Sequence, residues 1–291
     1  MKISRGTTVV ISAVVAIALL LPLPAAAKPR WLQLPPTPSR PPALRSGFAP
    51  VNGIKMYFAI YGHGSPVILL HSGLANSDYW GNQLPELSRH NEVIVADSRG
   101  HGRSTRTAQP YSYGLMASDV IALMDFLKIP RAAIVGWSDG AIIGLDIAIH
   151  HPERLTKVFA FAANYNPSGV RSDIGKSPTF NAFIARCGQD YQRLSPTPSQ
   201  YKEFLAAIQK MWATEPNYSK DQLRSISVPV VIADGDHDEA IERHQTEEMA
   251  TLIPNAGLLI QPGVSHFSML QDPRQFNQDV LDFLMDWPSA P

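Results

Sequence analysis

The sequence has one cysteine and no net charge. Lys and Arg together number 25 among 291 residues, and Asp and Glu together also number 25. A single cysteine, Cys187, excludes an intrachain disulfide and any Cys-x-x-Cys metal or redox site. We expect its thiol to pack as a small hydrophobic group. Because the charges balance, no long-range attraction draws the chain to nucleic acid or acidic lipid, and nucleic acid is not an expected partner.

Metal-binding patterns are also missing. The nine histidines show no His-Glu-x-x-His or comparable spacing, which argues against a zinc site. Residues 234–238, Asp-Gly-Asp-His-Asp, suggest a calcium loop. An EF-hand loop needs glycine at its sixth position and glutamate at its twelfth, where this chain has Glu239 and Gln245. The sequence therefore predicts neither a metal nor a cofactor.

The N-terminus has the pattern of a secretory signal. Lys2 and Arg5 precede an apolar run over residues 9–23, and residues 25–27 are small, as signal peptidase requires. We expect a signal peptide over 1–27 and export to the periplasm or the medium. An uncleaved membrane anchor is the alternative, but the run is shorter than the ~20 residues of a membrane span and contains proline. A lipoprotein anchor is excluded because no cysteine follows the run.

A single domain is predicted over residues 48–287, after a proline-rich linker over 28–47. The 45% hydrophobic content is enough for one large core. A hairpin over 48–59 turns at Asn-Gly, and apolar strands then alternate with helical patterns, which predicts a mostly parallel sheet covered on both faces. The expected strands are 67–70, 93–96, 132–136, 157–162, 229–233 and 257–260, and the main helices are 113–128, 139–150, 243–253 and 273–286.

The interval 164–227 interrupts this alternation. It contains no convincing strand, whereas 180–191 and 201–212 have helical patterns, so we expect a helical cap after the sixth strand. Large apolar residues in or near it are candidates for an acyl pocket, although such residues at helical spacing more often form a cap's own core. They are Phe159, Phe161, Tyr165, Phe180, Phe183, Tyr191, Phe204, Met211 and Trp212.

Residues 136–140, Gly-Trp-Ser-Asp-Gly, join an apolar strand to a helical stretch. A serine there is held on a sharp turn with its hydroxyl clear of the backbone, and a side chain at either glycine would collide with the neighbouring strand or helix. This pattern indicates a nucleophile elbow with Ser138 as nucleophile. An ordinary turn serine is the alternative, because the pentapeptide arises by chance on the order of 0.1 times in such a chain.

Two later loops supply an acid and a base. The strand 229–233 ends in the acidic loop 234–238, and His266 follows the last predicted strand. The order Ser, Asp, His is that of α/β-hydrolase triads and differs from the chymotrypsin and subtilisin orders. Because His266 alone follows the last strand with an acid upstream, it is the candidate base.

Further motifs resemble the α/β-hydrolase superfamily over residues 48–287. Residues 71–74, His-Ser-Gly-Leu, resemble its His-Gly-x oxyanion loop, with serine in place of the usual glycine. Residues 97–104 resemble its Asp-x-Arg-Gly-x-Gly-x-Ser signature. The resemblance implies the α/β-hydrolase fold, a mostly parallel eight-stranded sheet flanked by helices, with a small helical cap after the sixth strand. The family's Gly-x-x-Asp aligns with residues 235–238, which implies Asp238 as the acid and leaves Asp236 as the alternative.

The resemblance further implies a serine hydrolase for small-molecule carboxylic esters. Ser138 would attack the acyl carbon, His266 would take its proton and Asp238 would orient the imidazole. The expected oxyanion donors are the backbone N–H of Asp139 and that of Gly73 or Leu74. No cofactor is implied.

Other functions remain open on the same triad. Lactonases, thioesterases, aminopeptidases and cofactor-free perhydrolases keep the serine, whereas haloalkane dehalogenases and epoxide hydrolases need an aspartate there. A catalytically inactive binding module is an alternative of another class, but it has no reason to retain all three triad residues. The elbow is similar to that of valacyclovir hydrolases, in which the acid beside the serine helps receive a substrate ammonium. Asp139 is either such a residue or an acid that caps the following helix.

Overall fold

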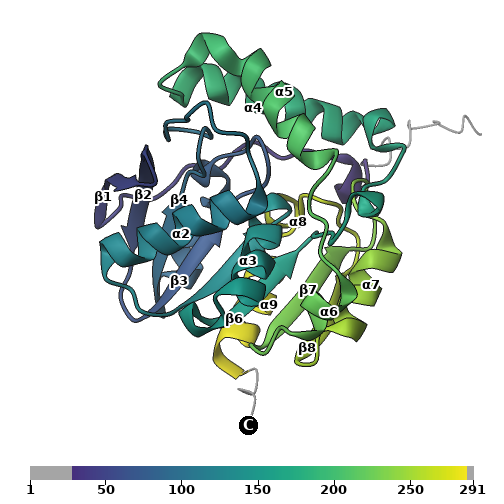
Figure 1. Cartoon of the computed structure of the whole chain (residues 1–291). Coiled ribbons are helices and arrows are strands. Elements are labelled where there is room, and N and C mark those ends of the chain that lie inside the picture. The colour runs from purple at the N-terminus through teal and green to yellow at the C-terminus, as the bar shows by residue number, and fades with distance from the viewer. Residues whose placement is uncertain (1–27, 287–291) are drawn as a thin grey trace, which may run out of the picture.

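The computed structural model describes residues 28–286, and the predicted signal peptide over 1–27 lies outside the described residues. An eight-stranded sheet forms its centre (Figure 1), in the order β1-β2-β4-β3-β5-β6-β7-β8. Strand β2 pairs antiparallel with β1 and β4, and all other neighbours are parallel, as predicted. The strands are β1 (Arg45–Val51), β2 (Ile54–Tyr61), β3 (Ser65–Leu70), β4 (Asn91–Ala96), β5 (Ala132–Trp137), β6 (Leu155–Phe161), β7 (Val230–Gly235) and β8 (Ala256–Gln261).

Helices cover both faces of the sheet, so the central strands are apolar along their length rather than alternating. In Figure 1 the helices α2 (Tyr113–Leu127), α3 (Asp139–His150) and α7 (Arg243–Leu252) lie in front of the sheet. The helix α9 (Pro273–Asp286) lies behind it and packs on α1 (Leu84–Leu87) and α8 (Ser268–Gln271). Among the helices of residues 28–286, none combines the length and apolar character needed to span a bilayer.

The cap lies between β6 and β7. Its helices are α4 (Pro178–Leu194), α5 (Tyr201–Trp212) and the short α6 (Lys220–Arg224). Figure 1 shows α4 and α5 above the carboxyl ends of the parallel strands. The hydroxyl of Ser177 accepts the backbone N–H of Phe180, which caps the first turn of α4.

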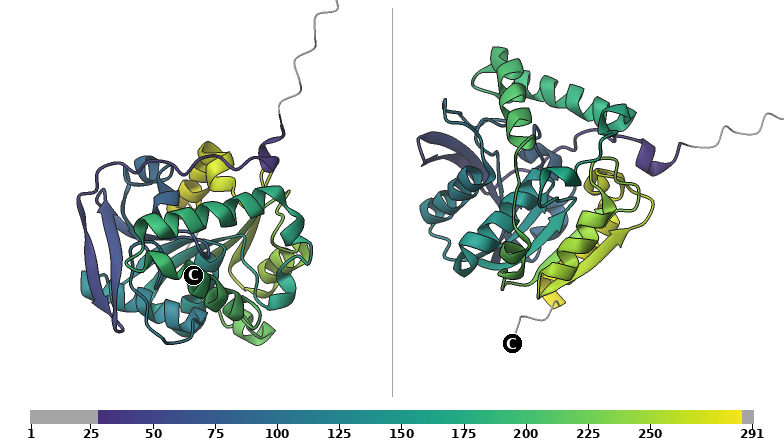
Figure 2. Two further views of the ribbon diagram at one scale, coloured as in Figure 1. Left: turned by 90° about the horizontal axis from the view of Figure 1, so that it is seen from above. Right: turned by 45° about the vertical axis from the view of Figure 1, so that its right-hand side comes forward.

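Residues 28–44, here called the strap, lie along the molecular surface (Figure 2) and are extended except for one 3-10 turn over Arg30–Leu32. The sequence predicted an extended linker over 28–47. In the structure residues 45–47 belong to β1, and the residues before them are docked on the domain. Arg186 of α4 donates to the backbone oxygens of Leu34 and Pro35 at 3.2 and 2.6 Å. The Trp31 ring stacks on His237 with ring centroids 4.0 Å apart. The strap therefore contacts both the cap and the acidic loop after β7.

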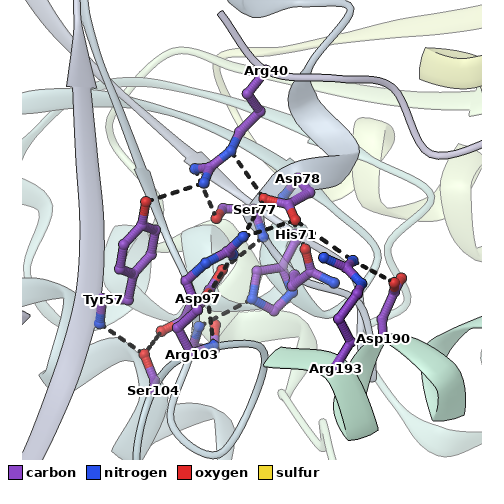
Figure 3. Close-up of polar contacts among 12 residues, drawn as sticks. Arg40, Tyr57, His71, Ser77, Asp78, Asp97, Arg103, Ser104, Asp190 and Arg193 are labelled. Carbon is purple, nitrogen blue, oxygen red and sulfur yellow. Dashed lines mark hydrogen bonds and ion pairs between the residues drawn. The ribbon is translucent and has the colours of Figure 1, made fainter. Parts of the chain in front are cut away.

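One carboxylate joins the strap, the core and the cap (Figure 3). Asp78 pairs with Arg40 of the strap at 2.9 Å, with Arg103 at 2.9 Å and with Arg193 of α4 at 3.8 Å. Arg103 also pairs with Asp97 of the signature loop at 3.3 Å. Because Asp78 is largely buried, its charge needs these partners, and the network ties α4 to the loops beneath it.

Candidate active site

Ser138 lies between β5 and α3 in a strained conformation. Its φ of 54° and ψ of −117° fall outside the regions that non-glycine residues ordinarily adopt. A Cβ at Gly136 would overlap the backbone of Ala141, and a Cβ at Gly140 would overlap the backbone of Leu70. The first clash is with α3 and the second with β3. Both elbow glycines are therefore required by close backbone approach, as the sequence predicted.

Asp238 and His266 form a buried pair. Nδ1 of His266 lies 2.8 Å from Oδ2 of Asp238, and each side chain is 2% exposed. The backbone N–H groups of Ala240 and Ile241 donate to Oδ1 of Asp238 at 2.6 and 2.8 Å. The Asp236 side chain is 36% exposed. The structure thus brings Asp238 beside His266 and leaves Asp236 at the surface.

The surroundings of the pair favour an ionised acid and a strengthened base. Burial raises the pKa of Asp238, but the charge and hydrogen bond of His266 outweigh it and hold that pKa below its usual range. Burial lowers the pKa of His266, but the charge and hydrogen bond of Asp238, with Glu239 and Asp139, leave it above its usual value. The imidazole therefore accepts a proton more readily than a free histidine does.

A cavity of about 550 Å³ lies between the cap and the sheet. Ser138 and His266 both line it, as do Gly73 and Asp139. The N–H of Asp139 belongs to the first turn of α3, where backbone donors have no partner within the helix. Leu74 is buried and has a φ of 64°, but it is not among the described residues that line the cavity. Of the expected oxyanion donors, Gly73 and Asp139 are the two at the cavity.

The remaining wall of the cavity is mostly apolar. Of the nine large apolar residues considered from the sequence, Phe180, Phe183 and Trp212 line it. The others pack elsewhere, for example inside the cap, where Tyr191 stacks on Phe204 with ring centroids 4.9 Å apart. Asp139 and Glu215 are acidic members of the wall, and no lysine or arginine of residues 28–286 lines it.

The Asp139 side chain makes contacts that the sequence did not predict. The Tyr113 hydroxyl donates to its Oδ1 at 2.9 Å, and the indole N–H of Trp212 lies 3.0 Å from both oxygens. Burial nevertheless raises the pKa of Asp139 to about 6. A Cβ at Gly73 would overlap both Asp139 and Trp212, so only glycine fits there. This carboxyl group therefore joins the elbow, the oxyanion loop and the cap.

Two more residues at the site gave no signal in the sequence. The indole N–H of Trp137 donates to the backbone oxygen of His266 at 2.8 Å, which links the elbow to the histidine loop. Glu239 accepts the backbone N–H of His266 at 3.1 Å. Both contacts join segments far apart in the chain. In the part of the chain that the structure describes, no group of three or more His, Cys, Asp or Glu side chains is arranged to hold a metal ion.

Comparison with known proteins agrees with this architecture. Residues 67–279 match the model of the Alpha/beta hydrolase family. A putative carbamate hydrolase RutD of Caulobacter is 28% identical over 76% of this chain and 93% of its own length. A 3-oxoadipate enol-lactonase of Acinetobacter baylyi is 26% identical over 78% of this chain and 92% of its own. A solved N-acyl homoserine lactone degrading enzyme is 28% identical, with a TM-score of 0.64 over 82% of this chain and 100% of its own.

Proposed function

Because the chain belongs to the alpha/beta hydrolase family, we propose that it is a serine hydrolase that cleaves carboxylic esters of small molecules. The observation that carries this proposal is that His266, which pairs with the buried Asp238, lines the same cavity as the strained Ser138. Nδ1 of His266 faces Asp238, which leaves Nε2 to accept the serine proton.

The reaction proceeds in two half-reactions. Oγ of Ser138 attacks the acyl carbon while Nε2 of His266 takes its proton, and Asp238 stabilises the imidazolium. The N–H groups of Gly73 and Asp139 stabilise the oxyanion, each by about 3 kcal/mol. Collapse of the tetrahedral intermediate expels the alcohol, which receives the proton from His266. Water then attacks the acyl-serine with the same base, and the carboxylic acid leaves.

The cavity favours uncharged acyl groups of moderate size. Its volume of about 550 Å³ falls in the range of small-molecule sites. Phe180, Phe183 and Trp212 offer apolar contact, while Asp139 and Glu215 are acidic. A substrate carboxylate buried here would meet no cationic partner from a lysine or arginine of the described wall, and it would be repelled by ionised Asp139.

Lactone hydrolysis is a second candidate function. Two of the similar proteins described above are named for lactones, an enol-lactone in one case and an N-acyl homoserine lactone in the other. A lactone is a cyclic ester, so the same attack by Ser138 opens its ring. The alkoxide leaving group then stays attached to the acyl group and is protonated by His266.

A panel of p-nitrophenyl esters of increasing acyl length, with a γ-lactone and a matched amide, tests the proposal. We expect kcat/KM to rise with acyl length until the cavity is filled. The value of kcat/KM should be at least ~10-fold higher for the hexanoate than for the adipate monoester, in which a carboxylate replaces the terminal methyl group. Turnover of no ester and no lactone would contradict the proposal, and a preference for the amide would point to a peptidase. Ser138→Ala is the control for turnover outside the site.

A further inference from the structure

A fully buried carboxyl group lies behind the proposed triad acid. Asp234 is in β7, and it is 0% exposed. The backbone N–H of Gly235 donates to its Oδ1 at 2.8 Å, and the hydroxyl of Thr246 lies 3.0 Å from its Oδ2. The carboxyl groups of Asp234 and Asp238 are within hydrogen-bonding reach of each other. The reaction described above assigns no role to Asp234.

Two adjacent buried carboxyl groups are not both ionised at neutral pH, because each charge lacks water and repels the other. Asp238 holds the charge more easily, since it faces His266 and accepts two backbone N–H groups. Asp234 has no ion-pair partner among residues 28–286. Arg243 of α7 acts on it only from a distance and donates instead to the backbone oxygen of Gly235 at 2.7 Å. Burial and the charge of Asp238 hold the pKa of Asp234 well above its usual range.

We propose that Asp234 is protonated in the active protein and donates its hydroxyl hydrogen to the carboxylate of Asp238, as a positioning residue for the triad. This inference rests on the proposed function of the Asp238–His266 pair. Asp238 then accepts from four donors, namely Asp234, His266 and the backbone N–H groups of Ala240 and Ile241. Its Oδ2 is thereby held toward Nδ1 of His266.

A protonated Asp234 carries no charge, so it adds no negative charge that would raise the pKa of His266. The charged groups that face this cluster are Arg243 from α7, Glu239 beside Asp238, and His266 from the loop after β8. An ionised Asp234 would add a negative charge to this group and raise the pKa of His266 further. A neutral Asp234 supports Asp238 through a hydrogen bond without that cost.

Asp234→Asn tests the protonation state through the pH dependence of kcat/KM. Asparagine cannot ionise, but its amide donates to Asp238 and Thr246 and its oxygen accepts from Gly235. If Asp234 is neutral in the wild type, the midpoint of the acid limb, which reports His266, stays at its wild-type value. If Asp234 is ionised, loss of its charge lowers that midpoint by about one pH unit, and the proposal is overturned.

Asp234→Ala is the matched variant that removes the proposed hydrogen-bond donor to Asp238 altogether. We expect kcat to fall at least ~10-fold while KM changes little, because Asp238 loses orientation and substrate contacts remain. Asp234→Asn should restore most of this loss. Equal losses in the two variants, measured at wild-type levels of folded protein, would show that the hydrogen bond to Asp238 does not matter.

Infrared difference spectroscopy gives a readout that does not depend on activity. At pH 8 the wild type should show the C=O stretch of a protonated carboxyl group that Asp234→Asn lacks. Asp139, with a pKa of about 6, is ionised at that pH and does not contribute. Absence of this band from the wild type would overturn the proposal, and this result does not require that the protein hydrolyse any substrate tested.

Discussion

At the scale of single residues, the end of β7 and the loop after it place four carboxyl groups in different surroundings. Asp234 and Asp238 are buried, Asp236 is exposed, and Glu239 binds the backbone of His266. Their order in the chain does not reveal these differences, because each depends on which neighbouring segment covers the side chain. The roles of these residues are therefore separable by single substitutions.

The first prediction ranks two neighbouring acids. Asp238→Asn should lower kcat for ester hydrolysis by about 10⁴-fold, because an amide in that place favours the wrong imidazole tautomer. Asp236→Asn should stay within ~3-fold of the wild type, because its side chain does not reach His266. Steady-state kinetics with circular dichroism as a folding control decides the ranking. The reverse order would show that the acid has been misassigned.

The second prediction concerns the charge of Asp139, which helps to raise the pKa of His266. Catalysis needs neutral imidazole, so activity is lost as the pH falls through that pKa. Asp139→Asn removes the charge and should move the midpoint of the acid limb to lower pH. Because the pKa of Asp139 is about 6, the effect of its charge is present above pH 6 and fades below it.

The control for this shift is Asp234→Asn. It removes a different buried carboxyl group, one that we propose to be neutral. Its midpoint should not move. An Asp139→Asn variant with an unchanged or raised midpoint, measured in kcat/KM across pH, would contradict the assignment of a negative charge at Asp139.

Prediction from sequence succeeded at the residue scale where a motif specifies local backbone. Gly136, Ser138 and Gly140 belong to one turn, and their spacing alone determines its geometry. The contacts of Asp139 with Tyr113 and Trp212 could not be predicted in this way. They join residues from α2, α3 and α5, and no local pattern encodes that meeting.

At the scale of elements, the strap and cap helix α4 are held together by Arg186 and by the Asp78 network. Arg186 and Arg193 are seven residues apart and so lie on the same side of α4. Arg186 binds strap carbonyls, while Arg193 shares Asp78 with Arg40 of the strap. The composition of the strap predicts extended backbone, because proline fixes φ and removes a donor. It does not specify what that backbone contacts.

The third prediction tests this docking. Arg186→Ala should lower the free energy of unfolding by about 1 to 3 kcal/mol, because it removes two charge-assisted hydrogen bonds to the strap. Amide hydrogen exchange should become faster in both the strap and α4. The matched control is Arg224→Ala, which removes an exposed ion pair with Asp221 and should cost less than ~0.5 kcal/mol. Equal effects of the two substitutions would mean that the strap is not fastened by Arg186.

At the scale of the whole molecule, the site forms because parallel strands bring their carboxyl ends to one edge of the sheet. Ser138 follows β5, Asp238 follows β7 and His266 follows β8. The order of motifs along the chain was therefore enough to predict that these three residues lie at the same edge of the sheet. The lining of the cavity was not predictable, because the helical patterns of α4 and α5 do not say which face meets the sheet.

The central claim is that Ser138 is a nucleophile activated by the Asp238–His266 pair, and covalent labelling with a fluorophosphonate tests it most directly. Peptide mass spectrometry should locate one phosphonyl group on Ser138 in the wild type and none in Ser138→Ala. Labelling of His266→Ala should be at least ~10³-fold slower, since triad residues act as a unit. An adduct at another residue, or labelling of His266→Ala at the wild-type rate, would contradict the account.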